Sequence, residues 1–272
     1  MDYRRAVVFP GQGTTGGEVS GEVREAVERE VGGGEVPYQL AVFASSVTLF
    51  YRLREAGVEA DVVAGHSLGE YAAAHAAGAL TLDDGVRLVA ARDRLMSEAS
   101  EKNPGGMVAV IGADPRAVEE AVAGAEGVVV AANYNTPRQL VVSGERDALD
   151  RALENVKGRK VPLEVVGAFH SPLMRDASER MERLLEEVEF REPGVPIVSA
   201  ASGELLADAG KVKAALRAQM LLPVRWVEVV EKLRELGVRE VVECGEGGTL
   251  VRMLRDFKGV EISGEKAGEV LA

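Results

Sequence analysis

Residues 62–74 read VVAGHSLGEYAAA, a strand–turn–helix pattern from which the fold class follows. The apolar run at 61–65 predicts a buried strand, and the Ala-rich segment 68–79 predicts a helix. Between them, Gly65 to Gly69 match G-x-S-x-G, the tight turn that lifts a nucleophilic serine to a helix N-terminus. A glycine-flanked serine can also be a simple helix cap. The strand before Ser67 and the helix after it favour the nucleophile.

The remaining chain alternates short apolar runs with helical patterns, which is typical of an α/β fold. Further strands are expected at 7–9, 195–200 and 238–244, and further helices at 23–31, 39–56, 85–97, 173–188, from Lys211, at 222–236 and after 245. The segment that starts at residue 107 shows the order βαββαβ, with its last strand expected at 159–166. This is the order of a ferredoxin-like module. We therefore predict an α/β-hydrolase-like catalytic domain with a parallel sheet, made of residues 1–104 and 167–272. A ferredoxin-like subdomain, residues 105–166, is inserted into it.

Composition narrows the classes of partner. The chain has 272 residues and a net charge of −12, which disfavours nucleic acid as a ligand because phosphate binding needs clustered cations. The single cysteine, Cys244, excludes an internal disulfide and fits a reducing compartment. No apolar run approaches the roughly 18 residues of a membrane span, and the N-terminus lacks the apolar stretch of a signal peptide. We expect a cytoplasmic protein without a membrane partner.

The glycines at the N-terminus raise a second interpretation. Residues 7–17 read VVFPGQGTTGG, and Gly11, Gly13 and Gly16 fit the dinucleotide-binding pattern G-x-G-x-x-G. Pro10 speaks against that use. So does the absence of a second strand ending in an acidic residue within about 20 residues.

A serine nucleophile needs a general base, and the chain has three histidines. His66 adjoins Ser67 at the turn, so its side chain should project away, and His75 lies two turns further along the helix. His170 lies where the small module rejoins the larger domain, a usual place for a cleft. No acidic residue ends a main-sheet strand between Ser67 and His170. We therefore predict a Ser–His dyad whose imidazole is oriented by another acceptor, such as a backbone carbonyl.

An arginine interrupts the apolar face of the helix predicted at 85–97. Arg92 shares that face with Leu88, Val89 and Leu95, and burying a charge there is costly unless it is paired. The partner is either a structural carboxylate or an anionic substrate held by two hydrogen bonds.

Several motifs together resemble the malonyl-CoA:acyl-carrier-protein transacylases of fatty acid synthesis and the related acyltransferase domains of polyketide synthases. They span nearly the whole chain: FPGQG at 9–13, GHSLGEYAA at 65–73, Arg92 followed by Met96, NYNTPRQLVVSG at 133–144, GAFHSPLM at 167–174, and Gln219 before PVRW at 223–226.

The resemblance implies the reacting groups. Ser67 is the residue that becomes acylated, and His170 is its base. The backbone N–H groups of Gln12 and Leu68 form the oxyanion hole, so the glycine-rich loop serves an oxyanion rather than a pyrophosphate. The main-chain carbonyl of Gln219 orients the histidine, which would account for the missing acid.

The resemblance also implies the substrate contacts. Arg92 holds the free carboxylate of malonate, and Met96 lies in the same pocket. Phe169, directly before the base, is an aromatic residue of the kind that goes with malonyl rather than with methyl-branched units. No cofactor or metal is implied beyond malonyl-CoA as substrate. The acceptor is an acyl carrier protein, and the enzyme is expected to be a monomer.

Three features depart from the family's pattern. The segment 14–37 is short, so that much of a helical hairpin is missing. Leu222 precedes Pro223 where the family often has Asn, and Asp93 follows Arg92 where it often has Gly. None of these changes touches the predicted dyad.

The predicted function is two-step transfer of malonyl from malonyl-CoA, through malonyl-Ser67, to acyl carrier protein. The alternatives are a polyketide acyltransferase with another extender unit, a serine hydrolase of carboxylated esters, and an inactive homologue that serves as an interaction module. Because carrier proteins are acidic, docking needs a basic patch, for which the candidates are Lys157, Arg159, Lys160 and Arg175.

Overall fold

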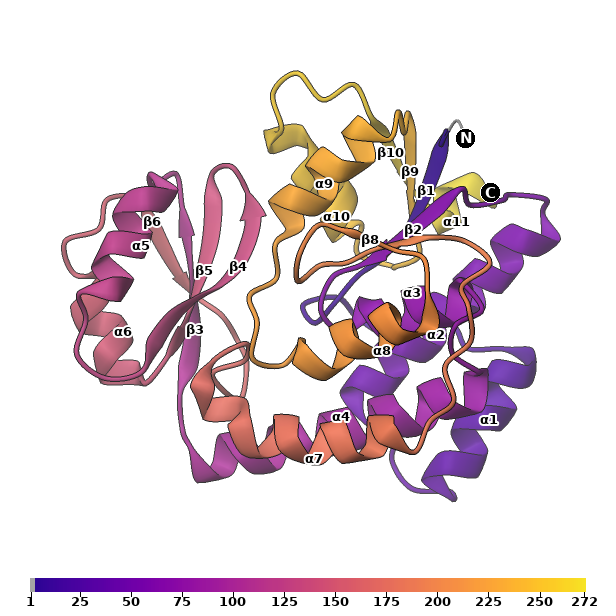
Figure 1. The fold of residues 1–272 in the computed structure, drawn as a ribbon, viewed down its shortest axis with the longest axis horizontal. Coiled ribbons are helices and arrows are strands. Elements are labelled where there is room, and N and C mark those ends of the chain that lie inside the picture. The colour runs from indigo at the N-terminus through magenta and orange to yellow at the C-terminus, as the bar shows by residue number, and fades with distance from the viewer. Residues whose placement is uncertain (1–2) are drawn as a thin grey trace.

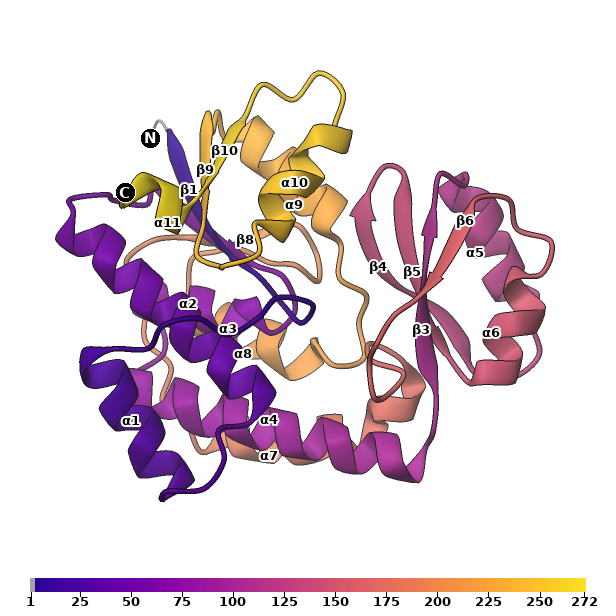
Figure 2. The same cartoon turned by 180° about the vertical axis from the view of Figure 1, so that it is seen from behind.

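The computed structural model describes residues 3–272 and has a mixed α/β fold with two sheets (Figures 1 and 2). The larger sheet has the strand order β10-β9-β1-β2-β7-β8, and the smaller has the order β4-β5-β3-β6. All pairs in the larger sheet are parallel except β7 with β8, and the smaller sheet is antiparallel. The predicted parallel sheet is thus present in the first of the two.

The larger sheet comprises β1 (Arg5–Phe9), β2 (Val62–Gly65), β7 (Ile197–Val198), β8 (Leu205–Leu206), β9 (Glu240–Glu243) and β10 (Ser263–Lys266). Its helices are α1 (Gly21–Val31), α2 (Tyr38–Glu55), α3 (Gly69–Ala76), α4 (Leu82–Lys102), α7 (Arg175–Glu186), α8 (Ala209–Ala218), α9 (Trp226–Glu235), α10 (Thr249–Met253) and α11 (Ala267–Val270). Two single-turn 3-10 helices are η1 (Pro172–Met174) and η2 (Leu254–Asp256).

Helices cover both faces of the larger sheet because its central strands are apolar on both sides. In β1, Val7 and Phe9 pack into the core that contains Phe43 of α2. Ala6 and Val8 point the other way and pack with Trp226 of α9. This alternation follows from the two-residue period of a strand. Buried on both faces, β1 and β2 form the rigid centre to which the site is attached.

The register of β1 and β2 brings two loops together. The strands are parallel, and Phe9 lies opposite Gly65 at their carboxyl ends. The FPGQG loop and the G-x-S-x-G turn therefore leave the sheet side by side, and the N–H of His66 donates to the carbonyl of Phe9 at 2.9 Å.

The smaller sheet and its two helices have the predicted βαββαβ order: β3 (Gly106–Ile111), α5 (Pro115–Ala123), β4 (Val129–Thr136), β5 (Gln139–Gly144), α6 (Arg146–Leu153) and β6 (Arg159–Pro162). Its edge strand β4 also bonds to the chain entering α9. Val224 donates to the carbonyl of Ala132 at 2.8 Å and accepts from the N–H of Tyr134 at 2.7 Å. This parallel bridge links the two sheets beside the cavity described below.

Most predicted elements are confirmed, with corrections at their ends. The helix expected at 85–97 runs from Leu82 to Lys102, because Thr81 caps its N-terminus by accepting from the N–H of Asp84 at 3.1 Å. The strand expected at 159–166 stops at Pro162, and the one expected at 195–200 is only Ile197–Val198. The helix expected at 68–79 ends at Ala76, and the one expected from Leu173 starts as η1.

Strands β8 and β10 and helix α11 were not predicted. The shortened segment 14–37 contains a single helix, α1. Within residues 3–272, no helix has the length and apolar character needed to span a membrane.

Candidate active site

The turn that carries Ser67 has the strained geometry of a nucleophile elbow. Ser67 lies between β2 and α3 with a φ of 51°, in the left-handed region that non-glycine residues rarely occupy. A Cβ on Gly65 would lie 2.1 Å from the carbonyl carbon of Gly69, and one on Gly69 would lie 2.1 Å from the carbonyl oxygen of Phe9. Only glycine fits at either position, so the G-x-S-x-G pattern follows from the packing.

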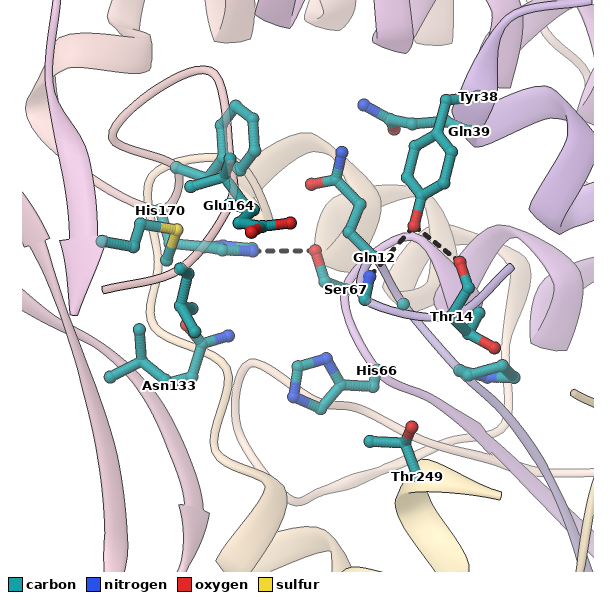
Figure 3. Close-up of a pocket in the computed structure, with 18 of the residues that line it drawn as sticks. Gln12, Thr14, Tyr38, Gln39, His66, Ser67, Asn133, Glu164, His170 and Thr249 are labelled. Carbon is teal, nitrogen blue, oxygen red and sulfur yellow. Dashed lines mark hydrogen bonds between the residues drawn. The ribbon is translucent and has the colours of Figure 1, made fainter. Parts of the chain in front are cut away.

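His170 lies within hydrogen-bond distance of Ser67. The Nε2 atom of His170 is 2.7 Å from the Oγ of Ser67 (Figure 3). His170 also has a left-handed φ, 56°, and the next residue, Ser171, fixes this turn by donating to the carbonyl of Ala168 at 2.6 Å. Both side chains are buried. The structure thus brings together the two residues that the sequence paired across 103 positions.

Two backbone carbonyls orient the imidazole. The Nδ1 of His170 is 3.0 Å from the carbonyl oxygen of Gln219 and 3.0 Å from that of Leu222. The expectation that Leu222 does not touch the dyad is therefore wrong, since its backbone contacts the base. Carbonyls only accept, so Nδ1 carries the proton and Nε2 is left as the acceptor toward Ser67. Burial, with a further contribution from the Arg92 charge, lowers the pKa of His170 to about 3. The imidazole is therefore neutral at ordinary pH.

The other two histidines are not hydrogen-bonded to Ser67 or His170, although His66 lines the same cavity. His66 points away from Ser67, as predicted, and its Nε2 is 2.9 Å from the Oδ1 of Asn135. His75 bonds to the hydroxyl of Tyr51 at 2.8 Å and the carbonyl of Leu80 at 2.9 Å. His75 is thus a packed histidine in contact with neither Ser67 nor His170.

Arg92 reaches the nucleophile from α4. Its side chain is completely buried, and one terminal nitrogen donates to the Oγ of Ser67 at 3.0 Å and to the Oε1 of Gln219 at 3.1 Å. The other terminal nitrogen donates to the Oε1 of Gln39, while Nε has no hydrogen-bond partner within the described residues. All three partners are neutral side chains. Glu70 and Asp93 act on the guanidinium only through space.

Asp93 explains one departure from the family pattern. Its Oδ1 accepts from the backbone N–H of Gln39 at 3.0 Å, at the N-terminus of α2. An acidic group is favoured at that end of a helix. Asp93 thereby holds Gln39, which in turn contacts Arg92.

The FPGQG loop lies against the elbow and borders the cavity. A Cβ on Gly11 would lie 2.6 Å from the carbonyl oxygen of His66, so this glycine allows the two loops to touch. Gln12 lines the cavity, and Leu68 is buried directly after Ser67. The phenol of Tyr38 fixes the loop: it accepts from the N–H of Gly13 at 3.0 Å and donates to the carbonyl of Thr14 at 2.7 Å (Figure 3).

A cavity of about 580 Å³ opens above Ser67 and His170, between the two sheets. Phe169 and Met96 line it, as predicted, while Arg92, Leu68 and Gln219 are buried behind its wall. The smaller sheet contributes Met107, Asn133, Asn135 and Val141. The rim includes the exposed apolar side chains of Leu163 and Val166.

Sequence reasoning missed three residues that contact the site. Gln39 was predicted only as the start of a helix and Tyr38 was assigned no role, because no local pattern relates them to Arg92 or to the FPGQG loop. Glu70, three residues after Ser67, was assigned no role; the available signal was a charged residue inside the Ala-rich segment 68–79. Within residues 3–272, no group of three or more His, Cys, Asp and Glu side chains is placed to hold a metal ion.

Comparison with known proteins agrees with this geometry. The acyl transferase domain family matches residues 20–262. The malonyl CoA-acyl carrier protein transacylase of Bacillus subtilis (strain 168) is 35% identical over 236 residues, which cover 83% of this chain and 74% of that protein.

Solved structures give the same result. The malonyl-CoA:acyl carrier protein transacylase of Xanthomonas oryzae pv. oryzae KACC10331 superposes with a TM-score of 0.89 at 31% identity, covering 97% of this chain and 94% of that one. A malonyl-transacylase in complex with its type II PKS acyl-carrier protein superposes with a TM-score of 0.87 at 30% identity, covering 97% and 95%. The chain therefore belongs to the acyl transferase family, among the malonyl CoA-acyl carrier protein transacylases.

Proposed function

We propose that this protein transfers a malonyl group from malonyl-CoA to the phosphopantetheine thiol of an acyl carrier protein. The observation that carries this assignment is the buried guanidinium of Arg92, 3.0 Å from the Oγ of Ser67 and bonded only to neutral groups. A desolvated guanidinium without a carboxylate partner favours an acyl group that brings its own. Malonyl has such a carboxylate at its free end, and acetyl does not.

In the first half-reaction, the Oγ of Ser67 attacks the thioester carbonyl carbon and gives its proton to the Nε2 of His170. The carbonyl oxygen becomes an oxyanion, which accepts hydrogen bonds from the backbone N–H groups of Gln12 and Leu68. When the oxyanion collapses, the C–S bond breaks. The CoA thiolate takes the proton from His170, which leaves malonyl-Ser67 and neutral imidazole.

In the second half-reaction, the phosphopantetheine thiol gives its proton to His170 and its sulfur attacks the malonyl ester. Collapse of this second oxyanion breaks the ester bond, and the Oγ of Ser67 leaves with the proton. The carbonyls of Gln219 and Leu222 hold the same tautomer through both steps. Gln219 thereby takes the orienting part that an acidic residue has in a triad.

The acyl pocket accounts for which acyl group the enzyme selects. Phe169 and Met96 line the cavity beside His170, and Arg92 is buried behind its wall. The Phe169 ring crowds the α-carbon of the bound acyl group, which favours unbranched malonyl.

The same proposal covers the architecture and partners. Residues 1–104 and 167–272 form an α/β-hydrolase-like catalytic domain, and residues 105–166 form a ferredoxin-like subdomain. The protein acts as a cytoplasmic monomer without metal or cofactor. The carrier protein docks on the exposed cations Lys157, Arg159, Lys160 and Arg175.

Intact-protein mass spectrometry tests this function. Incubation with malonyl-CoA should add one malonyl group, and holo carrier protein should then remove it and gain the same mass. The Ser67→Ala variant should acquire no label. Loss of the label to water alone would indicate a hydrolase, preferential labelling by a branched acyl-CoA would indicate a polyketide extender enzyme, and no label would indicate an inactive homologue.

A further inference from the structure

Two glutamates are buried among the described residues, and they have different surroundings. Glu243, at the end of β9, accepts from the backbone N–H groups of Thr249 and Val251 and so caps α10. Glu70 lies on α3, three residues after the nucleophile. Its Oε1 accepts from the N–H of Ala200 at 2.8 Å, and its Oε2 accepts from the side-chain Nε2 of Gln219 at 2.6 Å.

Gln219 connects this carboxylate to the three groups of the site. Its Nε2 also donates to the carbonyl of Ser67 at 2.9 Å, and its Oε1 accepts from Arg92 at 3.1 Å. Its main-chain carbonyl accepts from the Nδ1 of His170 at 3.0 Å. The orientation of this single buried residue therefore affects the nucleophile, the cation and the base together.

We propose that Glu70 is a positioning residue that fixes the orientation of Gln219, and through it the geometry of Ser67, Arg92 and His170. This inference rests on the proposed function. It adds an acidic residue that acts on the dyad indirectly, through Gln219. The acid lies on the nucleophile's own helix, and it acts through an amide rather than on the imidazole.

The reason lies in the hydrogen-bonding capacity of each group. An ionised carboxylate only accepts, so Gln219 must present its NH₂ to Glu70. Its Oε1 then faces the guanidinium, which only donates. A neutral side chain at position 70 permits the amide to turn over, which would place NH₂ against the guanidinium of Arg92. The bond between Glu70 and Gln219 thus acts together with the Ser67 carbonyl and the Arg92 guanidinium to exclude a competing arrangement of the site.

The charge on Glu70 also links this arrangement to pH. Burial raises the pKa of Glu70 to about 7, against the lowering effects of Gln219, the Ala200 N–H and the Arg92 charge. The charged and titratable groups that act on it are Arg92 of α4 and the adjacent Tyr71 on α3. Above neutral pH, Glu70 is an acceptor only; below it, the carboxyl gains a proton that it can donate, and the constraint on Gln219 weakens.

The test compares Glu70→Gln with the wild type in the acylation of Ser67 by malonyl-CoA, from about pH 5.5 to about pH 8.5. We expect kcat to fall by about 10- to 100-fold at the alkaline end, the scale of a small displacement of reacting groups. KM should change little. The ratio of the two rates should shrink toward acid pH, because wild-type Glu70 is then protonated.

Two further variants separate positioning from a structural role. Glu243→Gln removes the other buried carboxylate charge; it should lower the melting temperature and leave the pH profile unchanged. In a Gln219→Ala background, Glu70→Gln should cause little further loss, because the connection is already broken. An equal loss in that background, or a lowered melting temperature with unchanged kcat and pH profile, would overturn the proposal.

A fluorophosphonate probe keeps this test independent of the acyl donor. It reacts with an activated serine, so its rate reports the state of Ser67 even if malonyl-CoA is not the substrate. Slower probe labelling of Glu70→Gln without malonyl labelling of the wild type would support Glu70 and refute the proposed function. Malonyl labelling of the wild type, with equal probe rates for the wild type and Glu70→Gln, would support the proposed function and refute the role of Glu70.

Discussion

Two residues of this site, Ser67 and His170, have backbone conformations that are unfavourable for their type. Their φ values are 51° and 56°, whereas every other positive φ in the described chain belongs to a glycine. Each such residue costs on the order of 1–2 kcal/mol. These backbone conformations direct the two side chains toward each other, so that the Oγ of Ser67 lies 2.7 Å from the Nε2 of His170. Stability and activity therefore oppose each other at these two positions.

This opposition can be measured at Ser67. Both Ser67→Ala and Ser67→Gly remove the nucleophile, but only glycine adopts a positive φ without a steric penalty. We expect Ser67→Gly to be more stable than Ser67→Ala by about 1 kcal/mol, because the left-handed strain is relieved. Denaturant unfolding of the two inactive variants gives the difference directly. Equal midpoints would mean that the turn is not strained in solution.

Arg92 should select the acyl group. Loss of one side of a desolvated, charge-assisted pair typically costs about 2–5 kcal/mol, or roughly 30- to 5,000-fold in rate. Arg92→Ala should therefore lose malonyl transfer by such a factor. Transfer of acetyl or longer uncharged acyl groups should hold or rise, because the unpaired guanidinium is gone. Rates with malonyl-CoA and acetyl-CoA measure the change.

Arg92→Lys is the matched control, since it retains the charge. It should rescue malonyl transfer only in part, because an ammonium cannot make the two parallel bonds of a guanidinium. If Arg92 were instead a structural cation, every acyl group would lose equally and the melting temperature would fall.

At the scale of elements, opposite ends of two helices meet at the dyad. Ser67 precedes the N-terminus of α3, where unpaired N–H groups favour developing negative charge. Gln219 follows the C-terminus of α8, where unpaired carbonyls favour the positive charge that forms on His170. The two helix ends thus stabilise the charge separation that proton transfer creates.

Tyr38, at the start of α2, fixes the FPGQG loop. Tyr38→Phe removes the hydrogen bonds to Gly13 and Thr14, the two residues directly after Gln12. We expect kcat to fall by about 10-fold, less than the loss of an oxyanion donor itself, with little change in KM. Steady-state kinetics of malonyl transfer measure it. Tyr51→Phe, which removes a hydroxyl bonded to His75 instead, should leave kcat unchanged.

The sequence predicted the elements whose signals are local. The strand and helix around Ser67 and the βαββαβ order were found because apolar period and turn residues mark them. Strand β10, with the sequence SGEK, has no apolar signal, because it is a half-exposed edge strand defined by pairing with β9. The strand expected at 195–200 is only two residues long, because β7 pairs with β2 and with β8 over Ile197 and Val198 alone.

The candidate site divides in the same way. Local patterns pointed to three residues. Ser67 lies in a G-x-S-x-G turn, His170 lies where the small module rejoins the larger domain, and Arg92 interrupts an apolar helix face. Glu70, Gln39 and Tyr38 contact the site only through long-range bonds, such as the one that joins Glu70 to Gln219 across 149 positions. No window of the sequence contains both partners of such a bond, so these residues could be found only from the three-dimensional structure.

At the scale of the whole molecule, the cavity belongs to both sheets. The larger sheet supplies the elbow and the FPGQG loop, while the smaller one supplies Met107 and Val141. The two are linked by the bridge between β4 and Val224 and by the turn that carries Phe169 and His170. The size of the acyl pocket is therefore set at the junction between the two sheets, where Phe169 is almost completely buried.

Phe169→Ser should enlarge that pocket at the acyl α-carbon. A ring that crowds this carbon rejects a methyl branch, and one methyl group in an apolar pocket is worth about 1–3 kcal/mol, or roughly 10- to 200-fold. We expect methylmalonyl transfer to rise relative to malonyl transfer by a factor within this range. Removing a buried aromatic ring also costs stability, about 3–5 kcal/mol for truncation to Ala, so absolute rates could fall for a trivial reason. The ratio of the two rates in one preparation cancels the folded fraction. An unchanged ratio would therefore mean that Phe169 does not contact the acyl group, whatever happens to the total activity.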